Sequence, residues 1–327
     1  MTIFLTFDYE LFFGENPGSV EKCMIYPTDL LLDLAKKHGV PMTFFIDIGF
    51  VLALEKYKSD FQQLESDYQK VIAQLERMKA AHCDIQLHIH PHWERSYFDG
   101  TRWMIVTENC YKLSDFSSEE RDSIVIRYKN RLDELRGSTS SAFRAGGWCI
   151  QPFSELQSIF KTVGIRIDSS VFAGGFFDGG EYNFDFRSAP TQSWYRFEDD
   201  VCNPEPTGSF EEFAIGSHRY SPLFYWKLYI AGRLDPKNHK MIGDGIFLTQ
   251  PGRKQHVMTS FTQNHVSTDG FYASKLQSCT ENYLKRNEKC LVTIGHPKSS
   301  TYYSLKKLDA YLEKYRDRVT FLGFEKI

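Results

Sequence analysis

Three histidines, His88, His90 and His92, stand within five residues of this sequence. Imidazole is the commonest protein ligand for zinc and similar divalent ions. His88 and His92 are four residues apart and can converge on one ion if the chain makes a tight turn, which Pro91 and the strand-like run 84–87 predict. For His90 we expect a place beside the ligands, a substrate contact or plain packing. The alternative, a surface loop rich in histidine, is disfavoured because carboxylates occur at matching places elsewhere.

Other polar residues also follow strand-like runs. Residues 2–7 alternate β-branched and aromatic side chains, which predicts a buried strand that ends at Asp8. The polar residues at the ends of such runs are Asp8, His88, Arg144, Asp168 and His296. If the strands are parallel and form a barrel, all of these ends open onto one face, where active sites are built. Five such coincidences indicate a site.

Helical and strand-like patterns alternate along most of the chain. Helix signals cover about 29–38, 55–81 and 117–137, each followed by a short apolar run typical of a strand. Strands that alternate with helices imply a parallel sheet, and seven or eight of them predict a closed or nearly closed α/β barrel. From about 174 to 270 this rhythm breaks, and glycine, aromatic and turn residues dominate.

Composition excludes some classes of function. With 327 residues and 42% hydrophobic content, the chain can form one large domain or two ordinary ones. The net charge of −3 gives no basic face for nucleic acid. Seven cysteines without a C-x-x-C pair favour reduced thiols, and neither a signal peptide nor a membrane-length apolar stretch is present. We therefore expect a soluble, cytoplasmic protein; its oligomeric state is left open.

The motif stretches together resemble the NodB-homology polysaccharide deacetylases, which are metal-dependent hydrolases on a distorted (β/α) barrel. The stretches similar to the five family motifs are Thr6-Phe7-Asp8-Tyr9-Glu10, His88 with His92, Arg144-Ala145-Gly146-Gly147, Asp168, and Ile294-Gly295-His296. The resemblance covers about 1–172 and 288–327. It implies a single domain over 1–327, in which we interpret 174–270 as an insertion at the barrel mouth.

The sequence departs from the family pattern in two places. Tyr9 stands where the family has its second aspartate, normally a metal ligand, and Gly146 replaces a proline. Asp8 and Glu10 are two residues apart, so in a regular strand both side chains leave on one face. We therefore expect Glu10 to join His88 and His92 around a divalent metal, with zinc as the expected ion.

The resemblance implies amide hydrolysis, in which Asp8 is the general base for a water molecule and Arg144 pairs with Asp8 and orients it. His296 then protonates the leaving amine, and Asp168 holds its imidazole. The backbone N–H of Gly147 joins the metal as an oxyanion hole. Two structural alternatives remain: Arg144 as an ion pair only, and Asp168 as a cap for the loop that follows it.

Trp93 and Trp148 flank the motif residues, and each is expected either to stack on a sugar ring or to pack in the core. The predicted function is removal of N-acetyl groups from a sugar in a polysaccharide or glycan precursor. The alternatives are a metal-dependent C–N hydrolase for a small amide or ureide, and a catalytically silent carbohydrate-binding protein that has lost the metal. Tyr9 keeps the last of these open.

Overall fold

The computed structural model describes residues 1–248 and 252–327. Strand β1 (Thr2–Tyr9) is buried from its second residue onward, and burial on both faces is typical of a parallel strand covered by helices. It pairs in parallel with β2 (Thr43–Asp47) on one side and with β14 (Cys290–Gly295) on the other. The beginning and the end of the chain therefore meet at β1.

Seven parallel strands follow one another around the predicted barrel, in the order β14, β1, β2, β3, β6, β7 and β11. The bounds of the remaining four are β3 (Asp84–Ile89), β6 (Ala142–Ala145), β7 (Ile167–Asp168) and β11 (Phe210–Phe213). Ile215, just past β11, forms a parallel bridge to Val292 of β14. A single bridge thus brings the two edges together, and the distorted α/β barrel of about seven parallel strands is confirmed.

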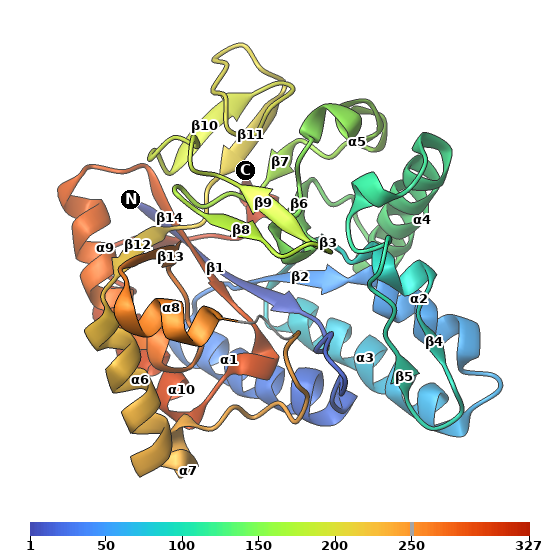
Figure 1. Cartoon of the computed structure of the whole chain (residues 1–327), viewed down its shortest axis with the longest axis horizontal. Coiled ribbons are helices and arrows are strands. Elements are labelled where there is room, and N and C mark those ends of the chain that lie inside the picture. Colours follow the sequence, from blue (N-terminus) through green and yellow to red (C-terminus); the bar gives the residue numbers. More distant parts are fainter. Residues whose placement is uncertain (249–251) are drawn as a thin grey trace.

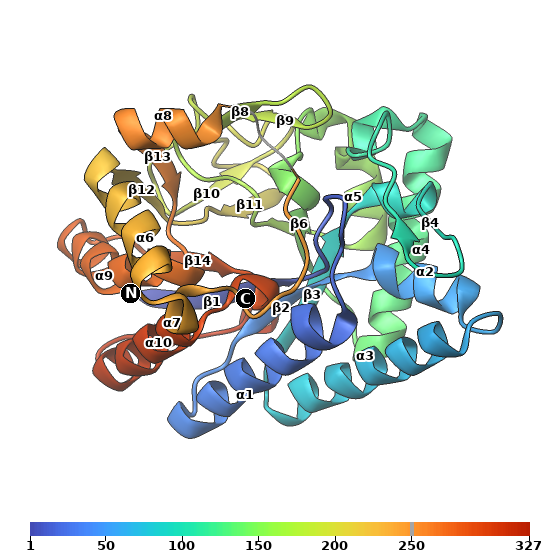
Figure 2. The ribbon, with the colours of Figure 1, turned by 60° about the horizontal axis from the view of Figure 1, so that its bottom comes forward.

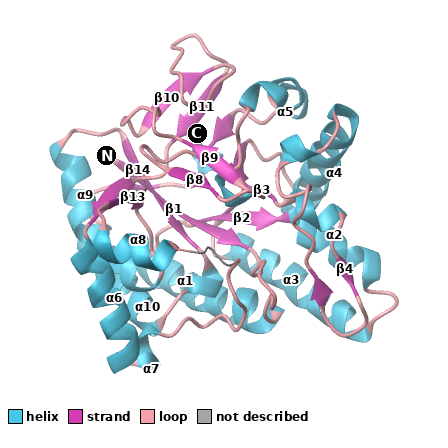
Figure 3. Cartoon of the chain, viewed as in Figure 1, coloured by secondary structure: helices cyan, strands magenta, loops and turns pink. Residues whose placement is uncertain are grey.

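Helices surround the strands (Figures 1 and 3). The helices of this outer layer are α1 (Tyr26–His38), α2 (Ile48–Tyr57), α3 (Gln62–Ala80), α4 (Ser118–Arg136), α5 (Gln157–Val163), α9 (Leu276–Lys285) and α10 (Tyr302–Tyr315). α4 begins at the expected capping box, in which Ser117 and Glu120 bond each other's backbone N–H. The helix predicted at 55–81 is divided, because α2 ends at Tyr57 and α3 begins at Gln62.

The segment 174–270 divides into two parts. β11 is a barrel strand, and β10 (Trp194–Phe197) pairs with it antiparallel. The rest forms the hairpin β8 (Phe176–Asp178) with β9 (Asn183–Asp185), the pair β12 (Ser217–Tyr220) and β13 (Thr262–His265), and the helices α6 (Pro222–Leu234), α7 (Pro236–His239) and α8 (Arg253–Thr259). Figure 2 shows β8, β9 and α8 on one side of the strands, and α1, α3 and α10 on the other. The segment is thus not a pure insertion, since one barrel strand comes from it.

Two smaller elements complete the described chain. β4 (Tyr97–Phe98) and β5 (Trp103–Met104) form a short hairpin, and β15 (Thr320–Phe321) pairs with the start of β1. All seven cysteines are buried free thiols. Over the described ranges, no helix is long and apolar enough to cross a membrane.

Candidate active site

Strand β1 delivers two carboxylates to the mouth of the barrel. The side chains of Asp8 and Glu10 are almost completely buried there, as their spacing of two predicts. Tyr9 points the other way into the core, where burial raises the pKa of its phenol and the nearest charges are Arg77 and Asp29. Of the three residues, only the two acids reach the site.

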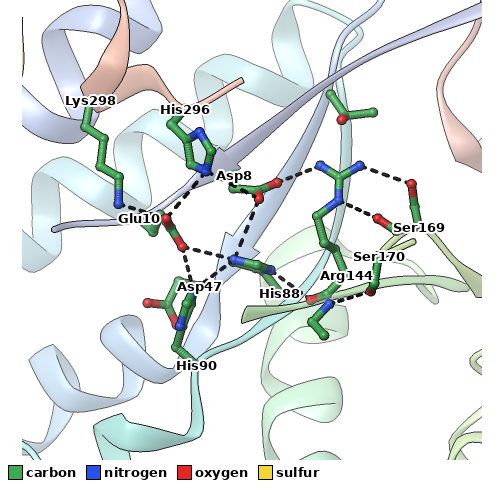
Figure 4. A network of polar contacts seen from close by, with 12 residues as sticks. Asp8, Glu10, Asp47, His88, His90, Arg144, Ser169, Ser170, His296 and Lys298 are labelled. Atoms are coloured by element: carbon green, nitrogen blue, oxygen red, sulfur yellow. Dashed lines mark hydrogen bonds and ion pairs between the residues drawn. The ribbon is translucent and has the colours of Figure 1, made fainter. Parts of the chain in front are cut away.

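The carboxylate of Glu10 contacts two histidines. One lies in β3, and the other directly follows that strand. The Oε2 atom of Glu10 lies 3.0 Å from Nε2 of His88 and 2.6 Å from Nε2 of His90. The two Nε2 atoms are 3.1 Å apart, and Figure 4 shows the three side chains pointing at one another. These groups form a buried cluster that could hold a metal ion.

His92 lies outside this cluster, whereas the sequence predicts it as the second histidine ligand. The reason is local geometry. The extended strand β3 continues past His88 to Ile89, so His90, two residues after His88, leaves on the same face. Pro91 then begins a 3₁₀ turn over Pro91–Glu94, which carries the His92 ring to a position between Phe13 and Tyr111, with centroid distances of 4.6 and 6.1 Å.

The donor set fits a divalent metal. The Nδ1 of His88 donates to the carbonyl oxygen of Arg144 at 2.8 Å, so a neutral His88 presents its Nε2 lone pair to the cluster. Burial lowers the pKa of His90 to about 4, so this imidazole is neutral at pH 7. Burial also lowers the pKa of His88, but Asp8 and Glu10 outweigh burial and raise it. A bound divalent ion would take both imidazoles in their neutral form, and two such imidazoles with a carboxylate are a donor set that zinc takes in catalytic sites.

Asp8 lies beside this cluster and is held by Arg144, as the resemblance implies. Nη1 of Arg144 donates to Oδ1 of Asp8 at 2.7 Å, and Nε donates to the Ser169 carbonyl at 2.7 Å. The guanidinium is fully buried, so its position is fixed by these contacts and by the Phe45 ring, 4.2 Å away. Oδ2 of Asp8 faces the cluster, 4.0 Å from Nε2 of His88.

His296 faces the same oxygen of Asp8 as His88 does. Its Nε2 is 3.7 Å from Oδ2 of Asp8 and 3.8 Å from Oε1 of Glu10. Its Nδ1 contacts Oδ2 of Asp269 at 2.8 Å, and the same carboxylate accepts the backbone N–H of His296. Burial lowers the pKa of His296, but Asp269, Asp8 and Glu10 outweigh burial and raise it.

Asp269 therefore occupies the place that the sequence analysis gives to Asp168. Asp168 instead accepts from the backbone N–H and the hydroxyl of Ser170, at 3.0 and 2.8 Å. This is the loop-capping alternative. Its other neighbour is Glu212 of β11, and burial together with the adjacent Asp168 raises the pKa of Glu212 well above its usual range.

A buried lysine completes the network. Nζ of Lys298 donates to Oε1 of Glu10 at 2.8 Å and to the Leu11 carbonyl at 2.5 Å. Its ammonium lies 4.8 and 4.9 Å from the ring centres of Phe12 and Phe13. Although burial raises the pKa of Glu10, Lys298 and the two histidines hold it well below its usual range. One oxygen of Glu10 thus faces a fixed cation, and the other faces the histidines.

Comparison with solved structures places this arrangement on a known fold. A protein described as a polysaccharide deacetylase from Mycobacterium smegmatis superposes with a TM-score of 0.52, over 99% of this chain and 87% of that one, at 12% identity. PuuE allantoinase superposes with a TM-score of 0.50, over 99% and 88%, also at 12% identity. The chain has the fold of a polysaccharide deacetylase. The resemblance stated from the sequence is confirmed at this level, while the sequence matches no family model and no curated protein.

On this deacetylase fold, the glycines of the third motif lie against the histidines. A Cβ at Gly146 would lie 2.5 Å from Nδ1 of His90, and one at Gly147 would lie 2.7 Å from the ring of Tyr111. Gly147 also has a left-handed φ of 58°. Both positions exclude larger residues, and the backbone here approaches the site closely.

The two predicted aromatic residues have different surroundings. Trp93 is buried among core rings, and its indole N–H donates to Asp47 at 2.7 Å, which is the packing alternative. Trp148 lines a cleft of about 1090 Å³. The cleft is bordered by aromatic residues of the β8–β9 hairpin and its neighbours, and by residues of α8. The aromatic residues that line it are Phe13, Trp148, Phe172, Phe176, Phe177, Tyr182, Phe184, Tyr225 and Phe261.

The sequence analysis missed two residues that contact the site, Asp269 and Lys298. Lys298 follows His296 by two residues on a 3₁₀ turn, and a lysine directly behind a motif histidine is a usable signal. Asp269 lies in the segment without regular rhythm, where neither periodicity nor motif spacing points to it. The sequence left the role of His90 open, and in the structure its imidazole contacts Glu10.

Proposed function

We propose that the chain is a metal-dependent hydrolase that removes N-acetyl groups from an acetylated sugar in a polysaccharide or glycan precursor. The observation that carries the proposal is the buried cluster of Glu10, His88 and His90, with Asp8 on its flank. The shared fold with a protein described as a polysaccharide deacetylase supports it. A divalent ion, with zinc as the expected one, would be held by the cluster, where it would polarise a carbonyl and lower the pKa of a water towards about 7.

Asp8 is the proposed general base. Because Arg144 holds Oδ1, the carboxylate is fixed with Oδ2 towards the cluster and can accept a proton there. A base in this position activates the attacking water without a change of rotamer.

His296 is the proposed general acid. Its Nδ1 is held by Asp269, so Nε2 is the atom turned towards Asp8 and Glu10. The raised pKa of His296 favours the imidazolium, which can donate its Nε2 proton to the departing amine. The backbone N–H of Gly147 remains the proposed oxyanion donor, and Trp148 is the proposed stacking surface for a sugar ring.

A second candidate is hydrolysis of a small ureide. PuuE allantoinase has the same fold at nearly the same TM-score. The size and the aromatic lining of the cleft favour a sugar, because sugar rings stack on aromatic faces while a small ureide fills little of such a volume.

The test uses purified full-length protein, first stripped of metal and then titrated with Zn²⁺. Acetate release is measured from N-acetylglucosamine oligomers and from acetylated monosaccharides, with allantoin as the ureide substrate. The proposal expects Zn²⁺ to bind one-to-one and acetate to be released only by the loaded protein. Ureide cleavage without acetate release selects the second candidate. Sugar binding without metal binding or turnover selects the silent binding protein.

A further inference from the structure

Helix α6 carries a stripe of four apolar side chains, each about half exposed or more. Leu223, Trp226, Ile230 and Leu234 are 62%, 49%, 49% and 81% exposed. Their spacing of three and four residues places them on one side of the helix. The opposite side packs on its own small core, built from Tyr220, Phe224, Tyr225 and Val257. α6 is therefore apolar on both sides, although it lies on the outside of the molecule (Figures 1 and 2).

Positive charge surrounds this stripe. At about 100° per residue, Lys227 lies on one border of the stripe and Arg233 on the other. Residues 218–240 contain five lysines and arginines but a single acid, Asp235, in a chain whose net charge is −3. Lys227, Arg233, Lys237 and Lys240 are exposed, and none forms an ion pair with a described carboxylate.

We propose that this face of α6 docks onto an anionic phospholipid bilayer. A helix lies in a membrane interface when leucine, isoleucine and tryptophan fill one face and lysine or arginine borders it. The apolar side chains then enter the acyl boundary, while the flanking cations meet the lipid phosphates. The 13 residues of α6 span about 20 Å, so the helix lies along the surface and does not cross the bilayer.

A second copy of the chain is the less suitable occupant. A two-fold dimer would place the same surface against itself. The basic residues around one stripe would then face those of the other copy, which costs free energy through like-charge repulsion. An anionic surface instead neutralises them.

The side of α6 opposite the stripe borders the substrate cleft. Tyr225 of α6, and Arg253, His256 and Val257 of α8, line the cleft. Docking through the stripe would therefore leave the cleft side of α6 free of the bilayer. The docking itself does not rest on the proposed function, because it is measured without turnover.

The test is flotation of the full-length protein with vesicles of phosphatidylcholine alone or with about 30% phosphatidylglycerol. We expect binding to the anionic vesicles, weak binding to the neutral ones, and loss of binding at high salt. Leu223→Gln with Ile230→Gln and Leu234→Gln should lower the partition coefficient by about tenfold or more. Lys227→Glu with Arg233→Glu should also lower it by about tenfold or more, through charge alone.

The matched control is Ile126→Gln with Tyr97→Gln, which removes exposed apolar residues from other elements. It should bind as the unchanged protein does. Thermal unfolding and light scattering are measured for every variant, so that misfolding and self-association are seen directly. The proposal is overturned if the unchanged protein ignores anionic vesicles, if the stripe variant binds them equally well, or if the stripe instead mediates a dimer.

Discussion

Two pairs of buried carboxylic acids lie in this barrel. Among the described residues, a cationic side chain contacts each acid of one pair but neither acid of the other. Asp8 and Glu10 each contact a fixed cation, Arg144 at 2.7 Å and Lys298 at 2.8 Å. Asp168 and Glu212 contact Ser170 and the backbone, and no cation is within ion-pair distance in the described chain.

Glu10 accordingly differs in its pKa from the two acids of the second pair. The pKa of Glu10 lies well below its usual range, because Lys298 and the histidines outweigh burial. The pKa values of Asp168 and Glu212 are raised, chiefly by burial. Burial alone therefore does not distinguish the acids proposed to react from those with a structural role, because all four are buried. The difference between Glu10 and the second pair comes from the positive charge beside Glu10.

The largest effect is expected when Lys298 is replaced, because Glu10 then lacks a cation, as Asp168 and Glu212 do in the part of the chain that the structure describes. Lys298→Met leaves Glu10 buried without its cation, so the free energy of unfolding of the metal-free protein should fall by about 3–5 kcal/mol. Zn²⁺ should restore part of this stability, because it supplies positive charge to the same carboxylate. The measurement is urea unfolding with and without Zn²⁺, and Lys306→Met, at an exposed position, is the control. Unchanged stability would show that Lys298 does not balance Glu10.

Replacing Asp8 should separate base function from metal binding. Asp8→Asn keeps the shape but cannot accept a proton, so kcat for acetate release should fall about 100-fold or more. Zn²⁺ affinity, measured by calorimetry, should change little. Asp168→Asn is the matched control in the other acid pair and should leave kcat within a few-fold. An equal fall in kcat in both variants would show that Asp168 takes part in the reaction.

The histidines offer a direct choice between the ligand set predicted from the sequence and the one the structure favours. His90→Asn should weaken Zn²⁺ binding about tenfold or more, since loss of a ligand is at least as costly as loss of a supporting contact. His92→Asn should change it much less. Competition with a chelator measures both affinities. The reverse order would restore His92 as the ligand.

The smallest effect is expected at Glu212, as a change in pH dependence. Its pKa in the folded protein is raised above about 4.5, so the native state holds a proton that the unfolded state releases. Stability should therefore fall as pH rises above about 4.5, by at most about 1.4 kcal/mol per pH unit. Glu212→Gln should flatten this slope, whereas Glu211→Gln, on the other face of β11, should not. Urea unfolding at about pH 5, 6, 7 and 8 measures it.

Sequence patterns predict the fold well because the barrel depends on periodicity. The strand alternation at 2–7 and the capping box at Ser117 are local signals, and both appear where expected. β11 was not predicted, because its four residues, Phe-Glu-Glu-Phe, place two acids inside a barrel strand. One of them, Glu212, is buried, and burial raises the pKa of its carboxyl group.

The candidate site could be predicted only in part, because it depends on chain geometry between motifs. Asp8, Glu10, His88 and His296 are brought together as expected. Counting four residues from His88 led to His92, although a strand that continues through Ile89 presents His90 instead. Asp269 comes from a loop after β13, and only tertiary structure brings it to His296.

The absent side chain of Gly146 constrains how a site of this kind can arise. Any Cβ at this position would lie 2.5 Å from Nδ1 of His90 and 2.7 Å from the carbonyl oxygen of Ile89. A proline here, as in the family motif, and an imidazole at position 90 that faces Glu10 are therefore mutually exclusive unless the backbone moves. Glycine at position 146 is thus a precondition, in this backbone, for the contact between His90 and Glu10.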